Sequence, residues 1–81
     1  MKKRMDNGFH DIILAWSEDT SFGDLYTMIY DWITFYKSEI KAKDEVLDLL
    51  WRMEHGEELK VIVEDFITGE RYAKLRKQFS K

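Results

Sequence analysis

The sequence predicts an all-α fold, a small compact bundle of four to five helices around one central, aromatic-rich helix. Apolar residues recur at spacings of three and four along most of the chain, which is the pattern of one face of an α-helix. The chain contains no proline, so nothing chemically forbids long helices. Its 81 residues are enough for one domain only, and we expect residues 1–81 to form that domain.

The central helix is expected over residues 21–40, with Ser21 as its N-cap. Its main apolar face contains Phe22, Leu25, Ile29, Trp32, Ile33, Tyr36 and Ile40. Four further residues widen this face, Met28 and Phe35 on one side and Tyr26 and Tyr30 on the other. The apolar arc is then roughly twice the ~100° that a one-sided surface helix needs. Such a helix is either central to its own domain or partly covered by another chain.

A flexible basic arm and a first helix are expected before the central helix. The arm covers residues 1–7 and contains the basic residues 2–4. Asp6 or Asn7 is expected to cap the helix. Its apolar face consists of Phe9, Ile12, Ile13 and Trp16, although residues 11–16 would also suit a buried strand.

A third helix is expected after the segment 41–43, which contains two lysines, with Asp44 as its cap and Gly56 just beyond its end. Its core face contains Val46, Leu49, Leu50 and Met53. Asp48 and Arg52, one turn apart, are expected to form an ion pair worth about 0.3 kcal/mol.

Residues 57–79 allow two interpretations. Leu59, Ile62, Val63, Phe66 and Ile67 follow a helical pattern, whereas the β-branched residues 61–63 and the turn-like residues 67–70 favour a hairpin. The alternative fold is therefore α+β, with three helices and a C-terminal β-hairpin over residues 59–76. A helical last segment separates apolar Tyr72, Leu75 and Phe79 from basic Arg71, Lys74, Lys77 and Lys81. Because a strand would mix the two kinds on each face, we favour helices.

Charge is distributed unevenly along the chain, whose net charge is −3. Residues 5–70 contain all sixteen acids and five bases, whereas residues 71–81 contain five bases and no acid. The body is therefore acidic and both ends are basic. The chain has no cysteine and no apolar run near the ~18 residues of a membrane span, so we expect a cytoplasmic protein.

No catalytic, cofactor or metal site is expected. The only histidines, His10 and His55, lack the spacing of metal ligands, and no serine lies in a nucleophile motif. The four glycines are isolated and form no phosphate-binding loop. We therefore expect neither an enzyme nor a small-molecule substrate.

The aromatic residues outside the core face indicate protein binding. We expect a small regulator, inhibitor or adaptor that contacts a protein partner, or a second copy of itself, through Tyr26, Tyr30, Asp31, Phe35 and Trp51. Tyr30 and Trp51 are expected at the rim of this surface, with Tyr26 or Phe35 nearer its centre. The alternative is a nucleic-acid-binding accessory protein that uses the N-terminal arm together with Arg71, Lys74, Lys77 and Lys81. The size and composition are also typical of small accessory proteins of bacteria, phages and mobile elements.

Overall fold

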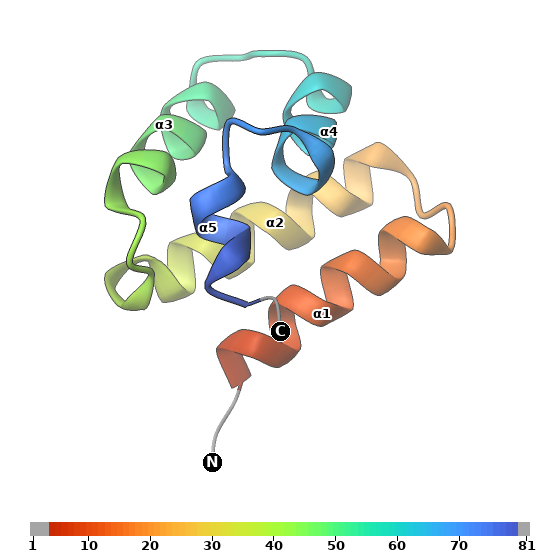
Figure 1. Cartoon of the computed structure of the whole chain (residues 1–81). Coiled ribbons are helices and arrows are strands. Elements are labelled where there is room, and N and C mark those ends of the chain that lie inside the picture. The colour runs from red at the N-terminus through yellow and green to blue at the C-terminus, as the bar shows by residue number, and fades with distance from the viewer. Residues whose placement is uncertain (1–3, 80–81) are drawn as a thin grey trace.

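Five α-helices and one 3₁₀ turn form residues 4–79, the part of the chain that the computed structural model describes (Figure 1). The elements are α1 (Arg4–Ser17), α2 (Phe22–Tyr36), η1 (Lys37–Glu39), α3 (Lys43–Glu54), α4 (Leu59–Thr68) and α5 (Ala73–Lys77). No strand occurs in residues 4–79. The predicted all-α bundle is therefore confirmed, and the alternative hairpin over residues 59–76 is wrong.

The helix α4 forms despite its β-branched residues because its apolar side chains meet the core at helical spacing. Ile62, Val63 and Phe66 are each fully buried, which a hairpin strand with one face in solvent could not achieve, because Ile62 and Val63 would point to opposite faces. Tyr72, Leu75 and Phe79 are likewise buried, as the helical interpretation predicts. The helix α5 is shorter than predicted, since Tyr72 is its N-cap residue and Phe79 follows its end. Tertiary burial thus overrides the local β propensity.

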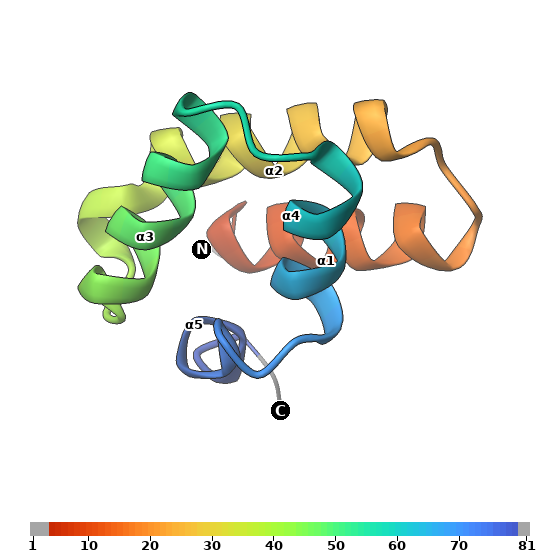
Figure 2. The same ribbon diagram turned by 90° about the horizontal axis from the view of Figure 1, so that it is seen from above.

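The helix α2 is central, and it packs against α1, α3 and α4. Figures 1 and 2 show α1 lying beside it as an antiparallel neighbour, with α3 and α4 on its other sides. Ser21 is the predicted N-cap, and its hydroxyl accepts a hydrogen bond from the backbone N–H of Asp24 at 3.2 Å. Leu25, Ile29 and Ile33 of α2 are fully buried.

The central helix ends four residues earlier than predicted. It stops at Tyr36 and tightens into η1, after which Ile40 is extended. The ammonium group of Lys43 donates to the carbonyl oxygens of Lys37 and Ser38 at 2.9 and 2.8 Å, and so satisfies acceptors that an α-helix would have bonded internally. Ile40 still reaches the core, where it is fully buried.

An aromatic cluster joins the two ends of the chain to α2. Trp32 is 5% exposed, and its ring lies 5.7 Å from Phe9 of α1, 6.0 Å from Phe66 of α4 and 5.1 Å from Phe79. Phe9 and Phe79 stack on each other at 5.1 Å. The indole N–H of Trp32 donates to the backbone carbonyl of Met5 at 2.9 Å. The buried ring therefore has its polar group satisfied.

Two predicted helix starts need correction. The helix α1 begins at Arg4, so residues 4–7 of the predicted arm are helical, and residues 1–3 lie outside the described residues. The bond from Trp32 to Met5 anchors this extra turn. The helix α3 begins at Lys43 with Ala42 as N-cap, so the predicted cap at Asp44 is wrong. Asp44 lies in the first turn, where a carboxylate favours the helix dipole.

Candidate protein-interaction surface

The side of the molecule formed by α2 and α3 carries three of the five residues predicted to bind a partner. Tyr26 and Tyr30 are half-buried, and their rings stack in parallel at 6.5 Å. The Tyr26 hydroxyl donates to the carbonyl of Met53 at 2.7 Å, and the Tyr30 hydroxyl donates to the Glu54 carboxylate at 3.4 Å. Burial, together with Tyr30 and Glu54, raises the pKa of Tyr26. The two tyrosines therefore hold α2 against the end of α3.

The most exposed apolar residues on this side are Leu47 and Trp51 of α3, at 65% and 61% exposure. They are one helical turn apart, so their side chains are neighbours on the outer side of α3. The imidazole of His55 stacks on the Trp51 ring at 4.2 Å, and its Nδ1 lies 2.8 Å from the Trp51 carbonyl oxygen. One face of the indole is therefore covered and the ring is oriented.

Two acids continue the same line of residues. Asp44, Leu47, Trp51 and Glu54 follow one another at spacings of three, four and three, which places them along one side of the helix. We call these four residues the outer stripe of α3. We call Tyr26 and Tyr30 together with the outer stripe the α2–α3 surface. The bond from Tyr30 to Glu54 makes this surface continuous across the two helices.

The other two predicted residues lie elsewhere on α2. Phe35 lies five positions after Tyr30, which corresponds to about 140° around the helix. Phe35 is 73% exposed, and within residues 4–79 its ring packs against one other aromatic ring, that of Tyr36, which lies nearly perpendicular to it at 4.7 Å. Asp31 is exposed and, one turn before Phe35, shares its side of the helix. The predicted surface is thus divided, and Phe35 cannot lie at its centre.

Leu47 is the residue of this surface that the sequence interpretation missed. It follows Val46, which belongs to the buried face of α3, and the sequence interpretation places Leu47 neither in the core nor on the binding surface. Its position four residues before Trp51 was the available signal, because two large apolar residues one turn apart outside the core face form a patch.

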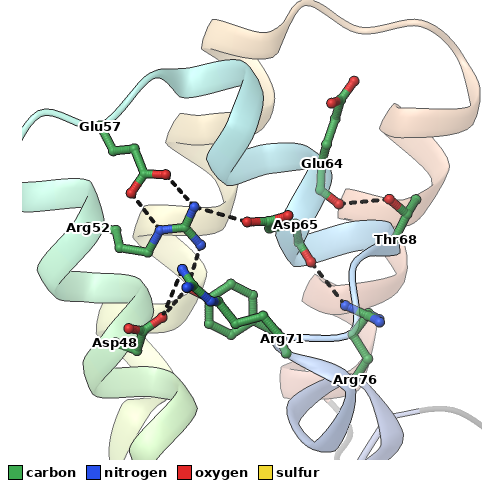
Figure 3. Close-up of polar contacts among 9 residues, drawn as sticks. Asp48, Arg52, Glu57, Glu64, Asp65, Thr68, Arg71 and Arg76 are labelled. Atoms are coloured by element: carbon green, nitrogen blue, oxygen red, sulfur yellow. Dashed lines mark hydrogen bonds and ion pairs between the residues drawn. The ribbon is translucent and has the colours of Figure 1, made fainter.

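A buried arginine holds the opposite side of α3 in place. Arg52 is only 4% exposed. Its guanidinium forms a two-pronged ion pair with Glu57, donates to Asp65 of α4 at 2.9 Å and donates to the Tyr72 hydroxyl at 2.9 Å. Figure 3 shows Glu57 and Asp65 converging on this group. The network therefore connects α3, α4 and the start of α5. Its hydrogen bonds also compensate for the cost of burying the charged guanidinium.

The hydrogen bonds of this network shift the pKa values of Arg52, Glu57 and Tyr72. The hydrogen bond to Glu57 raises the pKa of Arg52 in spite of burial, and the same contact lowers the pKa of Glu57. Burial, together with the bond from its hydroxyl to Asp48 at 2.5 Å, raises the pKa of Tyr72 to about 12 against the opposing effect of Arg52. At neutral pH Arg52 is therefore positively charged, Glu57 is negatively charged and the Tyr72 hydroxyl keeps its proton.

The predicted ion pair between Asp48 and Arg52 is wrong. Arg52 turns toward α4, and Asp48 bonds to Tyr72 and lies 3.8 Å from Arg71. The two residues are linked only through the Tyr72 hydroxyl, which accepts from Arg52 and donates to Asp48. A deeply buried guanidinium finds stronger partners in two carboxylates of other segments than in one neighbour along its own helix.

The basic C-terminal segment is bordered by acids. Arg71, Lys74 and Lys77 are exposed, and Lys81 lies outside the described residues. The Glu45 carboxylate of α3 accepts from the backbone N–H groups of Lys74 and Leu75 at 3.3 and 2.7 Å. A shallow depression beside it is lined by Lys41, Ala42, Lys43, Asp44, Glu45 and Lys74. The bases therefore do not form an uninterrupted positive face.

Arg76 has a structural role that the sequence interpretation did not identify. It is half-buried, and it donates to the carbonyl oxygens of Asp65, Phe66 and Gly69 at the end of α4. Figure 3 shows it reaching from α5 toward that end. A cation at this position supplies hydrogen bonds to carbonyls at the end of the helix and favours the helix dipole.

Residues 4–79 contain neither a candidate metal site nor a candidate membrane-spanning helix. No group of three or more histidines and carboxylates there could hold a metal ion. No helix in that range combines the length and apolar character that crossing a bilayer requires. No protein-family model matches the chain, and no curated protein and no solved structure matches it.

Proposed function

We propose that the chain is a non-catalytic protein-binding module that contacts its partner through the α2–α3 surface. The observation that carries this proposal is the adjacent exposure of Leu47 and Trp51 on one side of α3. Apolar residues that lie together on a surface commonly mark interfaces, and tryptophan is frequent among the residues that dominate binding energy. A regulator, inhibitor or adaptor of this kind would act by binding to a surface of its protein partner.

The rigidity of α3 supports the same proposal. The Arg52 network fixes the inner side of the helix, and the Tyr26 hydroxyl fixes its end at Met53. A surface that is ordered before binding loses little conformational entropy on association. Trp51, with His55 stacked on it, is such an ordered anchor.

The proposal is tested by site-specific photo-crosslinking in cells that express the chain. A photoreactive residue at position 47 should give a discrete crosslinked protein, and one at Leu14 should not, because Leu14 is 56% exposed but lies on α1. Trp51→Glu should abolish the crosslink. Its helical circular dichroism and cooperative melting should remain, because the side chain is not part of the core. Equal crosslinking from positions 47 and 14 would contradict the proposal.

Nucleic-acid binding is the second candidate, supported by the exposure of Arg71, Lys74 and Lys77. Asp44, Glu45 and the Asp48 carboxylate near Arg71 weaken it, because they would repel phosphates. Changing the three bases to glutamine should leave the crosslink at position 47 intact. Retention on a heparin column that these changes abolish, together with no crosslink, would favour the second candidate.

A further inference from the structure

The charges along the outer stripe of α3 restrict what kind of partner can cover it. Leu47 and Trp51 lie in the middle of the stripe, and Asp44 and Glu54 lie at its two ends. All four side chains are exposed. A partner that buries the two apolar anchors must therefore also face a carboxylate beyond each of them.

The bases of α3 do not neutralise these acids. Arg52 is buried and paired with Glu57 and Asp65. The ammonium group of Lys43 donates to two carbonyls at the end of α2 and in η1, which directs it away from the outer side of α3. Outside α3, Lys41 and Lys74 line the same shallow depression as Asp44, but neither forms an ion pair with it in residues 4–79. The outer stripe therefore presents apolar surface between two carboxylates that no ion pair within residues 4–79 engages.

We infer that the outer stripe of α3 binds a cationic amphipathic helix of a different protein, an inference that rests on the proposed function. The spacing of three, four and three is the spacing at which one helix packs along another. Leucine-type residues in the middle of the partner helix would cover Leu47 and Trp51. Lysine or arginine beyond them would meet Asp44 and Glu54, so apolar contact supplies affinity and charge selects the partner.

The same charges disfavour a second copy of this chain as the occupant. Two outer stripes packed antiparallel would place Asp44 of one copy against Glu54 of the other at both ends. Two parallel stripes would place each acid against its own equivalent. Either arrangement brings like charges together as the apolar residues are buried, and this opposes self-association through the stripe.

The inference is tested with two synthetic peptides of about 18 residues, or five helical turns. Both carry leucines at spacings of three and four, flanked by lysine in one peptide and by glutamate in the other. Binding to the full chain is followed by the indole N–H resonances in nitrogen-15 NMR spectra. The three tryptophans give an internal comparison, because Trp32 is buried and Trp16 is half-buried on another helix.

The lysine peptide should shift the Trp51 resonance and leave that of Trp32 in place. The glutamate peptide should bind at least about tenfold more weakly. Asp44→Asn with Glu54→Gln should weaken the lysine peptide about fivefold to tenfold, and Leu47→Ala should weaken it similarly. Asp11→Asn with Glu18→Gln, which removes the same charge from exposed positions on and just after α1, should have no effect.

Three results would overturn the inference. Equal binding of both peptides at Trp51 would show that charge does not select the partner, while the proposed function would stand. Binding of the lysine peptide that Leu47→Ala leaves unchanged would place it elsewhere on the acidic body. No shift of Trp51 with either peptide would exclude a helical occupant, and the crosslink from position 47 would then decide the proposed function separately.

Discussion

The guanidinium of Arg52 and the hydroxyl of Tyr72 are joined by a hydrogen bond of 2.9 Å across 20 residues of sequence. Arg52 belongs to α3 and also donates to Asp65 of α4, and Tyr72 is the N-cap residue of α5, so the bond connects three helices. The Tyr72 side chain is fully buried. The same hydroxyl donates to Asp48. It therefore completes a polar network behind the helix whose outer side is the candidate interface.

We predict that Arg52→Ala lowers the free energy of unfolding by about 3 kcal/mol. This is the lower end of the range for breaking a buried ion pair, because Glu57 and Asp65 are partly exposed and can be rehydrated. Arg71→Ala is the control, because its pair with Asp48 is long and exposed and should contribute at most about 1 kcal/mol. Urea unfolding measures both values. Equal losses would show that the network does not stabilise the fold.

Trp32→Ala should be the most costly single truncation in the core. The change removes a ring packed against Phe9, Phe66 and Phe79, and such losses cost about 3–5 kcal/mol. The melting temperature should fall by about 15 °C or more. Trp51→Ala provides the matched control and should change stability by about 0.5 kcal/mol or less, because that ring is exposed. A Trp32 variant that melts near the wild-type temperature would contradict the central role of α2.

Glycine-to-alanine changes should have opposite effects in α1 and α2. A Cβ at Gly8 would lie 2.6 Å from Cδ1 of Trp32, whose ring cannot move freely because it is packed and hydrogen-bonded. Gly8→Ala should therefore destabilise the fold by about 1–3 kcal/mol in spite of a better helix propensity. A Cβ at Gly23 meets nothing within 4 Å, so Gly23→Ala should stabilise by about 0.5–1 kcal/mol. Thermal melts of the two variants should shift in opposite directions.

Acid should weaken the fold partly through Glu57. Its folded pKa lies below the ordinary value of 4.5, so near and below that pH the unfolded chain binds more protons. The stability that the contact with Arg52 supplies is therefore complete above about pH 4.5 and is lost as the pH falls through the folded pKa. Urea unfolding at a series of pH values should show a smaller acid decline for Glu57→Gln than for the wild type.

Glu58→Gln is the control for this measurement, because the Glu58 carboxylate makes no ion pair within residues 4–79. It should leave the acid decline unchanged. An identical pH profile for the Glu57 variant and the wild type would show that the ion pair contributes no pH-dependent stability.

Helix type, the buried faces and two helix ends followed from the sequence alone. The spacing of apolar residues identified the buried sides of α2 and α3, and Ser21 and Gly56 marked ends where the backbone needs a cap or a positive φ. The separation of Tyr72, Leu75 and Phe79 from the bases identified a helical C-terminal segment, of which Ala73–Lys77 is α-helical. These features are local, because an α-helix repeats every 3.6 residues and its buried side depends on residues that are close together in the sequence.

Tertiary structure decided which side chains meet and which apolar residues remain outside. The partners of Arg52 are 5, 13 and 20 residues away, and the Glu45 carboxylate that caps α5 is 29 residues from Lys74. Phe35 and Tyr30 were grouped by composition but lie about 140° apart on α2. Leu47 is exposed because α4 and α5 cover only the other side of α3. Such pairings depend on how separate helices pack, and a periodic pattern within one helix carries no information about its neighbours.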